Sequence, residues 1–500
     1  MHEAGLDRPA RLGASQGIAI GLSLAGAALL AAVGHRYRID QVHCGTWPRA
    51  WHNVLAAGLY LLAISLLSLG WLRLLCLCQK SQGPTTRRIV LWGSLLYGIA
   101  ACGLPALSED PLFYAAISRV LGQYHASPYQ PFCQTLPIDD SLLQRMIPHW
   151  RCGSSPYQAG FHAVAWLLSM LSRGQLVWLL RGFQIVSALA LLLTGLLTAM
   201  AVRGSSIRPA YAAALVIFNP LSVVEGPASA HNDALLALAL SAVLLAWLHR
   251  RWGFTLLGLL AGLSIKISFV LVAALAGGAA LLSWLRQMGA FLHNQRASRA
   301  LFATLAVLVA GSTAAWLYVA RPVALFGSSS LPWEYCTRSI ECLPRTLLRT
   351  VLHQRQAAFG VAVGFRVLAA LWLFFATVRA SESPRKRLPW LGTGLLIYYL
   401  FLHPWSQSWY LLSLLPLLPW CTPRVFAALR AVSISASAYY ALVLIGNCLE
   451  DELAIAGFDL AEALLVLVPP TVCLLRDAPA QPTDAVEGGP RPPLVKDARV

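Results

Sequence analysis

The sequence predicts an all-α protein that crosses a membrane with about 13–14 transmembrane helices. Of its 500 residues, 57% are hydrophobic and only 12% are charged, which is about half the charged fraction of a typical soluble domain. The mean hydropathy is +0.62. Apolar runs of roughly 20 residues, the length that crosses a bilayer, recur along the chain.

The first apolar run follows Arg8 and Arg11 and has no small-residue cleavage signature after it, so it is expected to stay as a transmembrane helix. Further apolar runs continue to residue 475. The expected spans are 16–34, 53–77, 88–107, 176–202, 208–226, 231–249, 252–266, 268–285, 300–320, 357–379, 388–402, 407–421, 424–447 and 456–475.

Charge indicates how these spans are oriented. With the N-terminus inside and the apolar stretch 156–172 counted as a non-spanning juxtamembrane helix, six connections face the cytoplasm. They hold fifteen Lys and Arg residues and one acid, Glu382, as the excess of positive charge in cytoplasmic loops requires. Two long loops, 108–155 and 321–356, then lie outside. If 156–172 spanned the membrane instead, every later connection would change sides.

The net charge of +17 is explained by these cytoplasmic connections. No basic-aromatic module suggests nucleic-acid binding. Cysteines on the expected outer side can form disulfides, and Cys133–Cys152 and Cys336–Cys342 are candidate pairs within single loops. No cysteine spacing resembles a zinc site.

Carboxylates and other polar groups cluster at the expected outer ends of the spans. Glu109 and Asp110 follow the third span directly. They are either solvated acids at a helix end or a general base at the mouth of a cavity. Between two later spans stand His231, Asn232 and Asp233, six residues after Glu225. A helix cap accounts for one of these side chains but leaves the others without an explanation.

Lys266 interrupts the apolar run 256–278. One interpretation is a lysine that snorkels to the interface, which requires a helix break near 264–268. The other is an ammonium that pairs with an anion, most simply a phosphate. Two short spans that meet at Lys266 would place it at an outer turn.

Two further groups lie on the same expected side. His403, Trp405, Trp409 and Tyr410 form an aromatic turn that is typical of an interfacial belt and is also able to stack on a sugar or line a lipid groove. The outer loop 321–356 contains Arg338 and Arg345, against the charge rule, which makes it a candidate site for an anionic ligand. Together these residues suggest a phosphate-bearing, lipid-linked substrate.

Several of these residues also form an ordered set of short motifs. Asp110 is followed by "FYAAISRVLG" (113–122), which contains Tyr114, and by Pro128-Tyr129. Asp139 or Asp140, Trp150 and "SPYQAGF" (155–161), with Tyr157, come next. Asn219-Pro220-Leu221, His231-Asn232-Asp233, Lys266 and Trp409-Tyr410 complete the set.

In this order the motifs resemble the polyprenyl-phosphate-sugar-dependent glycosyltransferases of the GT-C fold, most closely the actinobacterial α-1,6-mannosyltransferases of lipomannan synthesis. The resemblance covers roughly residues 105–285 and, more weakly, 400–420. "PYQAG" stands where that family has "PYGPL". The motif loop follows the third span, whereas in many GT-C enzymes it follows the first.

The resemblance implies an inverting hexosyltransferase that moves a sugar, mannose by family likeness, from a polyprenyl phosphate to a glycan or glycolipid acceptor. The site would face the outside of a bacterial plasma membrane. Asp110 would be the base, with Glu109 beside it. Lys266 and Arg338 or Arg345 would stabilise the leaving phosphate, and the motif tyrosines and His231-Asn232-Asp233 would position hydroxyl groups. No cofactor or required metal is expected.

The expected spans and the resemblance together indicate a domain organisation. Residues 1–107 would form N-terminal transmembrane helices and 108–475 the catalytic membrane domain. Residues 476–500, rich in Pro, Asp and Gly, would form a disordered cytoplasmic tail. An alternative function is a transporter or flippase for lipid-linked saccharides. Inverted repeats would favour transport, and the sequence shows no convincing internal repeat.

Overall fold

The fold was analysed in a computed structural model of the chain. The residues that the structure describes are 13–36, 47–80, 83–105, 108–146, 148–291, 340–341, 344–345, 348, 352–403, 407–446 and 452–476. Every regular element among them is helical, as the composition predicts. The expected span 300–320, the candidate pair Cys336–Cys342, Arg338, Trp405 and the tail from 477 onward lie outside the described residues.

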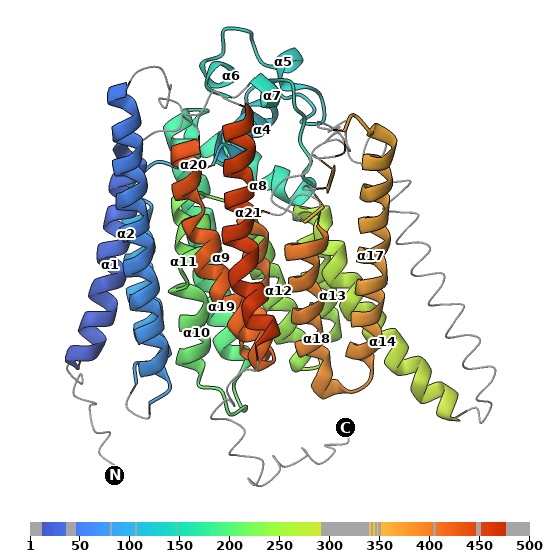
Figure 1. Ribbon diagram of the computed structural model, residues 1–500. Coiled ribbons are helices and arrows are strands. Elements are labelled where there is room, and N and C mark those ends of the chain that lie inside the picture. Colours follow the sequence, from blue (N-terminus) through green and yellow to red (C-terminus); the bar gives the residue numbers. More distant parts are fainter. Residues whose placement is uncertain are drawn as a thin grey trace.

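Long helices run side by side in a bundle (Figure 1). Within the described part, five are long and apolar enough to cross a membrane: Ala14–His35 in α1 (Ala14–Arg36), Asn53–Cys78 in α2 (Trp47–Cys78), α9 (Leu176–Ala201), α17 (Arg355–Ser381) and Pro423–Leu444 in α19 (Pro423–Ala438) and α20 (Tyr440–Gly446). The chain is therefore a polytopic membrane protein. The remaining long elements are α3 (Thr86–Ala100), α12 (Asp233–Leu248), α13 (Trp252–Ile265), α14 (Val270–Phe291), α18 (Pro384–Ile397) and α21 (Glu452–Leu475).

Several expected spans are interrupted, and the interruptions are places where backbone groups become free. Helix α10 (Pro209–Ile217) bends by 51° into α11 (Pro220–Val223) and the π-helical turn η2 (Val224–Ala228), because Pro220 cannot continue the hydrogen-bond ladder. A second π-helical turn, η5 (Tyr398–Leu402), ends α18, and η6 (Ser408–Trp420) is a 3-10 helix containing Pro416 and Pro419. π-helical turns are frequent at functional sites.

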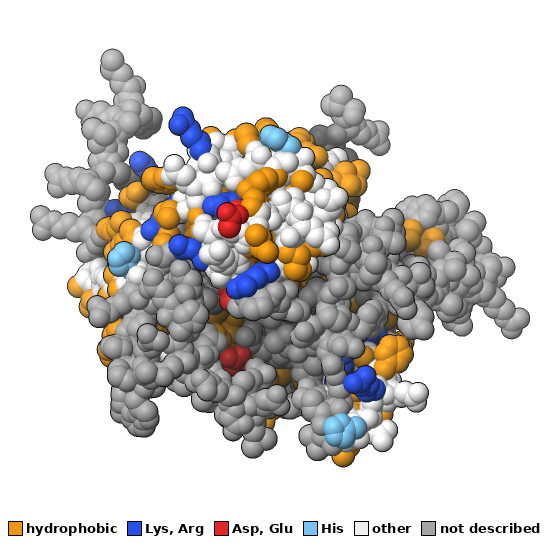
Figure 2. Space-filling model, turned by 90° about the horizontal axis from the view of Figure 1, so that it is seen from above, with side chains coloured by type: hydrophobic (Ala, Val, Ile, Leu, Met, Phe, Trp, Pro, Cys, Tyr) orange, Lys and Arg blue, Asp and Glu red, His pale blue; other side chains and the backbone are white. Residues whose placement is uncertain are grey.

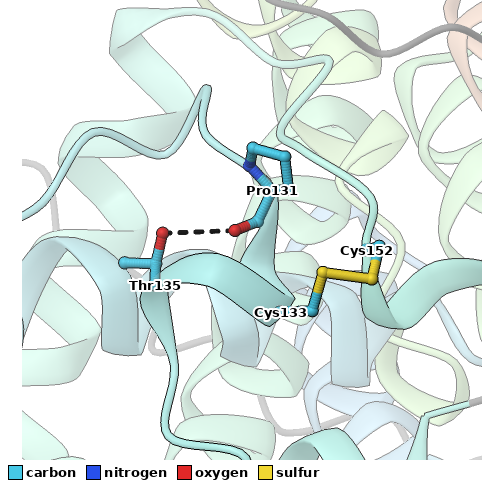
Figure 3. The surroundings of a disulfide bond; sticks show 4 residues. All are labelled: Pro131, Cys133, Thr135 and Cys152. Atoms are coloured by element: carbon cyan, nitrogen blue, oxygen red, sulfur yellow. Dashed lines mark hydrogen bonds between the residues drawn. A yellow bond between two sulfur atoms is a disulfide. The ribbon is translucent and has the colours of Figure 1, made fainter.

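The segment from 108 to 172 lies across one end of the bundle (Figure 1). It contains α4 (Asp110–Gly122), α5 (Phe132–Thr135), α6 (Ser141–Arg145), α7 (Pro148–Arg151) and α8 (Ala159–Ser172). The predicted disulfide Cys133–Cys152 ties α5 to the residue after α7 (Figure 3). The Thr135 hydroxyl donates to the Pro131 carbonyl at 3.2 Å in the same turn. Helix α8 has 14 residues, fewer than the roughly 20 that cross a bilayer.

Two hydrophobic cores hold these parts. The larger core joins α1, α2 and α3 to α9–α12, α18 and α19, with Trp71, Tyr60 and Tyr440 among its largest buried side chains. The N-terminal helices therefore pack into the same core as the rest of the bundle. The smaller core is formed mainly by α4–α8, around Tyr114, Phe132 and Phe161, and also includes residues of α9. Ionisable side chains gather where the two cores meet.

Candidate functional site

Asp110 is the first residue of α4. Its backbone N–H donates to the Ser108 hydroxyl at 3.2 Å, and Pro111 fits the first turn because that turn needs no backbone donor there. The carboxylate oxygen Oδ2 accepts from the hydroxyl of Tyr114, one turn later, at 3.3 Å. The side chain of Asp110 is 27% exposed. A carboxylate at a helix N-terminus is stabilised by the helix dipole.

Helix α9 holds the segment that leads into Asp110. Arg181 donates to the carbonyls of Ala101, Cys102 and Gly103 just beyond α3. One turn on, the buried Gln184 donates to the Gly103 carbonyl at 2.9 Å and to the Pro227 carbonyl at 2.8 Å. Gln184 thus joins the segment before α4 to the turn η2.

The turn η2 leads into the polar sequence 231–233. Pro227 lies inside it, and Ala230 beyond it adopts φ +60°, the left-handed region. That conformation is unfavourable for a residue with a Cβ. It reverses the chain so that the His231 N–H donates to the Glu225 carbonyl at 2.9 Å. On α9, Ser187 donates to the His231 carbonyl at 3.1 Å.

The imidazole of His231 lies between two carboxylates and against an indole ring. Its Nδ1 is 3.4 Å from Asp110 Oδ2, and its Nε2 is 3.3 Å from Glu225 Oε2. These are ion-pair distances without aligned hydrogen bonds. The ring stacks on Trp409 with centroids 4.0 Å apart and planes 13° apart. His231 is fully buried, so its position is fixed on three sides.

The next two residues face Tyr114 and Lys266. Asn232 Oδ1 accepts from the Tyr114 hydroxyl at 3.3 Å, while its buried Nδ2 has no hydrogen-bond partner within the described structure. Asp233, the first residue of α12, accepts from Lys266 Nζ at 3.0 and 3.2 Å. The anion beside Lys266 is therefore this carboxylate. Both members of the pair are largely buried, with side chains 14% and 2% exposed for Lys266 and Asp233.

Lys266 stands at a break, as predicted. Helix α13 ends at Ile265, Lys266 is extended, and η3 (Ile267–Phe269) leads into α14. The Ile265 carbonyl that the break leaves free accepts from the Gln158 N–H at 3.2 Å. A side chain at Gly160 would lie 2.3 Å from the Ser264 hydroxyl, so glycine is what permits this close approach.

Aromatic rings surround the lysine. Its Nζ lies 4.3 Å from the ring centre of Tyr410 and 5.9 Å from that of Tyr157, within cation–π range. The Tyr157 and Tyr114 rings meet edge to face at 5.6 Å. Burial raises the pKa of the Tyr157 hydroxyl well above its usual value. This residue therefore acts as a neutral hydroxyl and ring.

The turn before α8 is held by a serine–histidine pair. Ser155 Oγ lies 2.8 Å from His162 Nε2 and accepts from the Tyr157 N–H at 3.2 Å. Burial lowers the pKa of His162 to about 4, so the imidazole is neutral at physiological pH. The Tyr129 hydroxyl donates to the Tyr157 carbonyl at 3.3 Å. Tyr129 therefore lies behind Tyr157.

The other predicted residues fall into four groups. The His403 ring lies 5.1 Å from Tyr410 and 5.4 Å from Tyr398, so His403 is joined to the lysine through Tyr410. Arg345 pairs with the buried Glu341 at 2.5 Å, and Arg366 pairs with the same carboxylate at 2.6 Å. Glu109 occupies the N-cap position of α4. Arg338 and Trp405 lie outside the described residues.

Two motif carboxylates of the segment 108–172 are separate from this cluster. Asp140 pairs with Arg119 at 2.5 Å and accepts from the Leu142 N–H to cap α6. Asp139 is exposed. The capping accounts for Asp140 structurally.

Sequence reasoning did not select three contributors. Ser408 and Tyr440 both donate to Glu225, and Arg366 joins the Glu341 ion pair. Tyr440 lies in an apolar run with no motif around it, and Ser408 directly precedes the Trp409-Tyr410 motif without belonging to it. Arg366 is a single basic residue within an expected span, and an ionisable residue in such a position is itself an indication of function.

The described face at this end of the molecule shows Lys and Arg side chains among apolar ones and beside acidic groups (Figure 2). Within the described chain, no three His, Cys, Asp or Glu residues are arranged to hold a metal ion.

Comparison with known proteins adds one finding. Residues 11–286, more than half of the chain, match the family model described as alpha-(1->6)-mannopyranosyltransferase, N-terminal domain. The matched region includes α1–α3 as well as the segment from Asp110 to Lys266. No curated protein and no solved structure matches the chain significantly.

Proposed function

Since the chain belongs to the alpha-(1->6)-mannopyranosyltransferase family, we propose that it transfers mannose from a polyprenyl phosphate donor to a glycan or glycolipid acceptor. The reaction would take place on the extracytoplasmic side of a bacterial plasma membrane. The observation that carries this proposal is the partly exposed Asp110, held by Tyr114 and His231 beside an otherwise buried Lys266–Asp233 pair. In this proposal residues 108–475 form the catalytic domain.

Asp110 is the proposed general base. Its Oδ2 faces Tyr114 and His231, which leaves Oδ1 to face the acceptor. The acceptor hydroxyl gives its proton to Asp110 while its oxygen bonds to the anomeric carbon. The bond from that carbon to the phosphate oxygen breaks on the opposite side, so a β-linked donor gives an α-product. Glu109, adjacent at the helix cap, is the second candidate carboxylate.

Negative charge develops on the leaving phosphate, and a fixed cation stabilises it. Lys266 is the proposed cation, shared between Asp233 and the phosphate, with Tyr410 and Tyr157 around it. Arg345 is the second candidate, because the Glu341 carboxylate serves two arginines and leaves that trio with a net positive charge.

Polar and aromatic groups beside these residues suit a sugar. Among the described residues, no partner contacts the buried Asn232 Nδ2, and a buried unsatisfied donor is costly unless a ligand completes it. A sugar hydroxyl is the ligand we propose. Tyr114, Tyr129, Tyr157, His403 and Trp409 supply further ring faces and hydroxyls in this proposal.

Two observations support the extracytoplasmic side. The Cys133–Cys152 disulfide lies in the same segment as Asp110, and disulfides persist in oxidising compartments. The basic α9–α10 and α17–α18 connections lie at the opposite end of the bundle (Figure 1), as expected of cytoplasmic loops.

The Asp110→Asn variant tests the proposal in membranes supplied with radiolabelled polyprenyl phosphate mannose. Loss of the base should lower kcat by about 100-fold or more and leave thermal stability unchanged, because Asp110 is partly exposed. Asp139→Asn, the same change at an exposed site of the same segment, is the control and should keep full activity.

Full activity in Asp110→Asn would contradict the base assignment. Wild-type membranes that move the donor across the bilayer without forming a glycosidic bond would identify a transporter instead.

A further inference from the structure

Glu225 is the ionisable residue of the cluster that the proposed chemistry does not use. Its side chain is fully buried in η2. Burying a carboxylate is costly unless several partners compensate for the lost water. Its position beside His231 therefore requires an explanation.

Glu225 has partners on two distant elements, η6 and α20, and in the segment between η2 and α12. Ser408 on η6 donates to Oε1, and Tyr440 on α20 donates to Oε2 at 3.0 Å. The Tyr440 ring packs on Tyr439 and, edge to face, on Tyr60 of α2. The basic side chain that it contacts is His231, at 3.3 Å. Ser408 thus holds Oε1, while Oε2 accepts from Tyr440 and also lies nearest to the imidazole.

His231 carries this anchoring to Asp110. Its two ring nitrogens face the two carboxylates, Trp409 covers its face, and the Asp233 charge also lies close. The Glu225 carboxylate beside Nε2 and the stacked Trp409 ring fix where the imidazole lies, and its Nδ1 is 3.4 Å from Asp110 Oδ2. Oδ2 is thereby held away from the acceptor, and Oδ1 faces it.

We propose that Glu225 is a positioning residue that acts through His231 to fix the orientation of the Asp110 carboxylate. The inference rests on the proposed function, in which Asp110 is the base. Glu225 does not itself meet the substrate. Its loss should therefore lower kcat and leave the KM for the donor unchanged.

The experiment is a double-mutant cycle on purified full-length protein in lipid nanodiscs, with the variants Glu225→Gln, His231→Gln and the combination of both. We expect Glu225→Gln to lower kcat about 10–100-fold, the range for residues that orient a reactive group. Because both changes interrupt one chain of contacts, the combined variant should be no slower than His231→Gln alone.

Glu462→Gln provides a matched control, since it makes the same change at a buried glutamate of α21. It should leave kcat within about twofold, as expected of a site without contact to the reaction. Thermal unfolding of the wild type, the two single variants and the combined variant measures the Glu225–His231 coupling independently of activity.

The positioning role would be overturned if the losses in kcat multiplied, so that the combined variant was slower than His231→Gln alone. It would also be overturned if Glu225→Gln kept its kcat and only melted at a lower temperature. A wild-type protein that fails to transfer mannose would contradict the proposed function instead. In that case the unfolding cycle still decides whether the two side chains are coupled.

Discussion

At the scale of single residues, the ion pair Lys266–Asp233 is the strongest constraint in the cluster. The distance from Nζ to Oδ2 is 3.0 Å, and both side chains are largely buried. A snorkelling lysine would extend its ammonium into water, whereas this one meets a carboxylate and the Tyr410 ring. The lysine therefore has a structural role in addition to the proposed catalytic one.

Removing the lysine charge should consequently destabilise the protein. Lys266→Met leaves Asp233 buried without its cation, which costs about 3–5 kcal/mol in comparable buried pairs. Lys266→Met combined with Asp233→Asn should recover part of this loss while both variants remain impaired in donor use. Thermal unfolding in detergent measures the difference, and a combined variant no more stable than Lys266→Met would rule out this role.

At the scale of elements, the site is made by helices that stop. Helix α4 begins at Asp110, η2 and the left-handed Ala230 deliver His231, and α13 ends one residue before Lys266. Each end frees backbone groups that find partners in another element, such as Ile265 with Gln158. The turn 155–158 is the part of this arrangement that depends on a titratable side chain.

His162 should therefore make stability depend on pH. Its pKa falls to about 4 in the folded protein, compared with roughly 6.5 in an unfolded chain. Between these values the unfolded state binds more protons, so stability falls as pH decreases from about 6.5 to 4. In His162→Gln the melting temperature should vary less across this interval. An equal slope in the variant and the wild type would exclude His162 as the source.

These elements also show what the sequence allowed us to predict. Hydropathy located α9, α17 and the break at Lys266, because membrane burial requires long apolar runs and an ionisable residue within one is rare. It did not predict the π-helical form of η2 or the 3-10 form of η6, because these depend on partners far away in the chain. Tyr440 was missed for the same reason, since it reaches Glu225 across 215 positions.

At the scale of the whole molecule, the bundle and the segment 108–172 are distinct packing units that meet at the site. The N-terminal helices belong to the larger core, and Tyr60 of α2 touches Tyr440 directly behind Glu225. The smaller core has its own cross-link, Cys133–Cys152. The side of the membrane on which this segment lies can be tested directly.

The Cys152→Ser variant should unfold at a lower temperature, because a disulfide across 19 positions contributes about 3 kcal/mol. In intact cells, the released Cys133 should react with a membrane-impermeant maleimide, since it is exposed and the segment 108–172 is proposed to lie outside. Cys76, near the C-terminal end of α2, is the internal control and should react only after permeabilisation. Labelling with the reverse pattern would invert the proposed topology.

One face of α9 connects the segments that carry Asp110 and His231. Arg181, Gln184 and Ser187, spaced three residues apart, donate to the segment before α4, to η2 and to the His231 carbonyl. The two segments that carry Asp110 and His231 are therefore docked on one rigid rod and cannot separate without breaking its hydrogen bonds. We therefore expect that entry of the proposed lipid-linked donor requires movement of Tyr157 and Tyr410, the rings around Lys266. Amide hydrogen exchange should be slower along 101–103 and 225–231 than along 155–158.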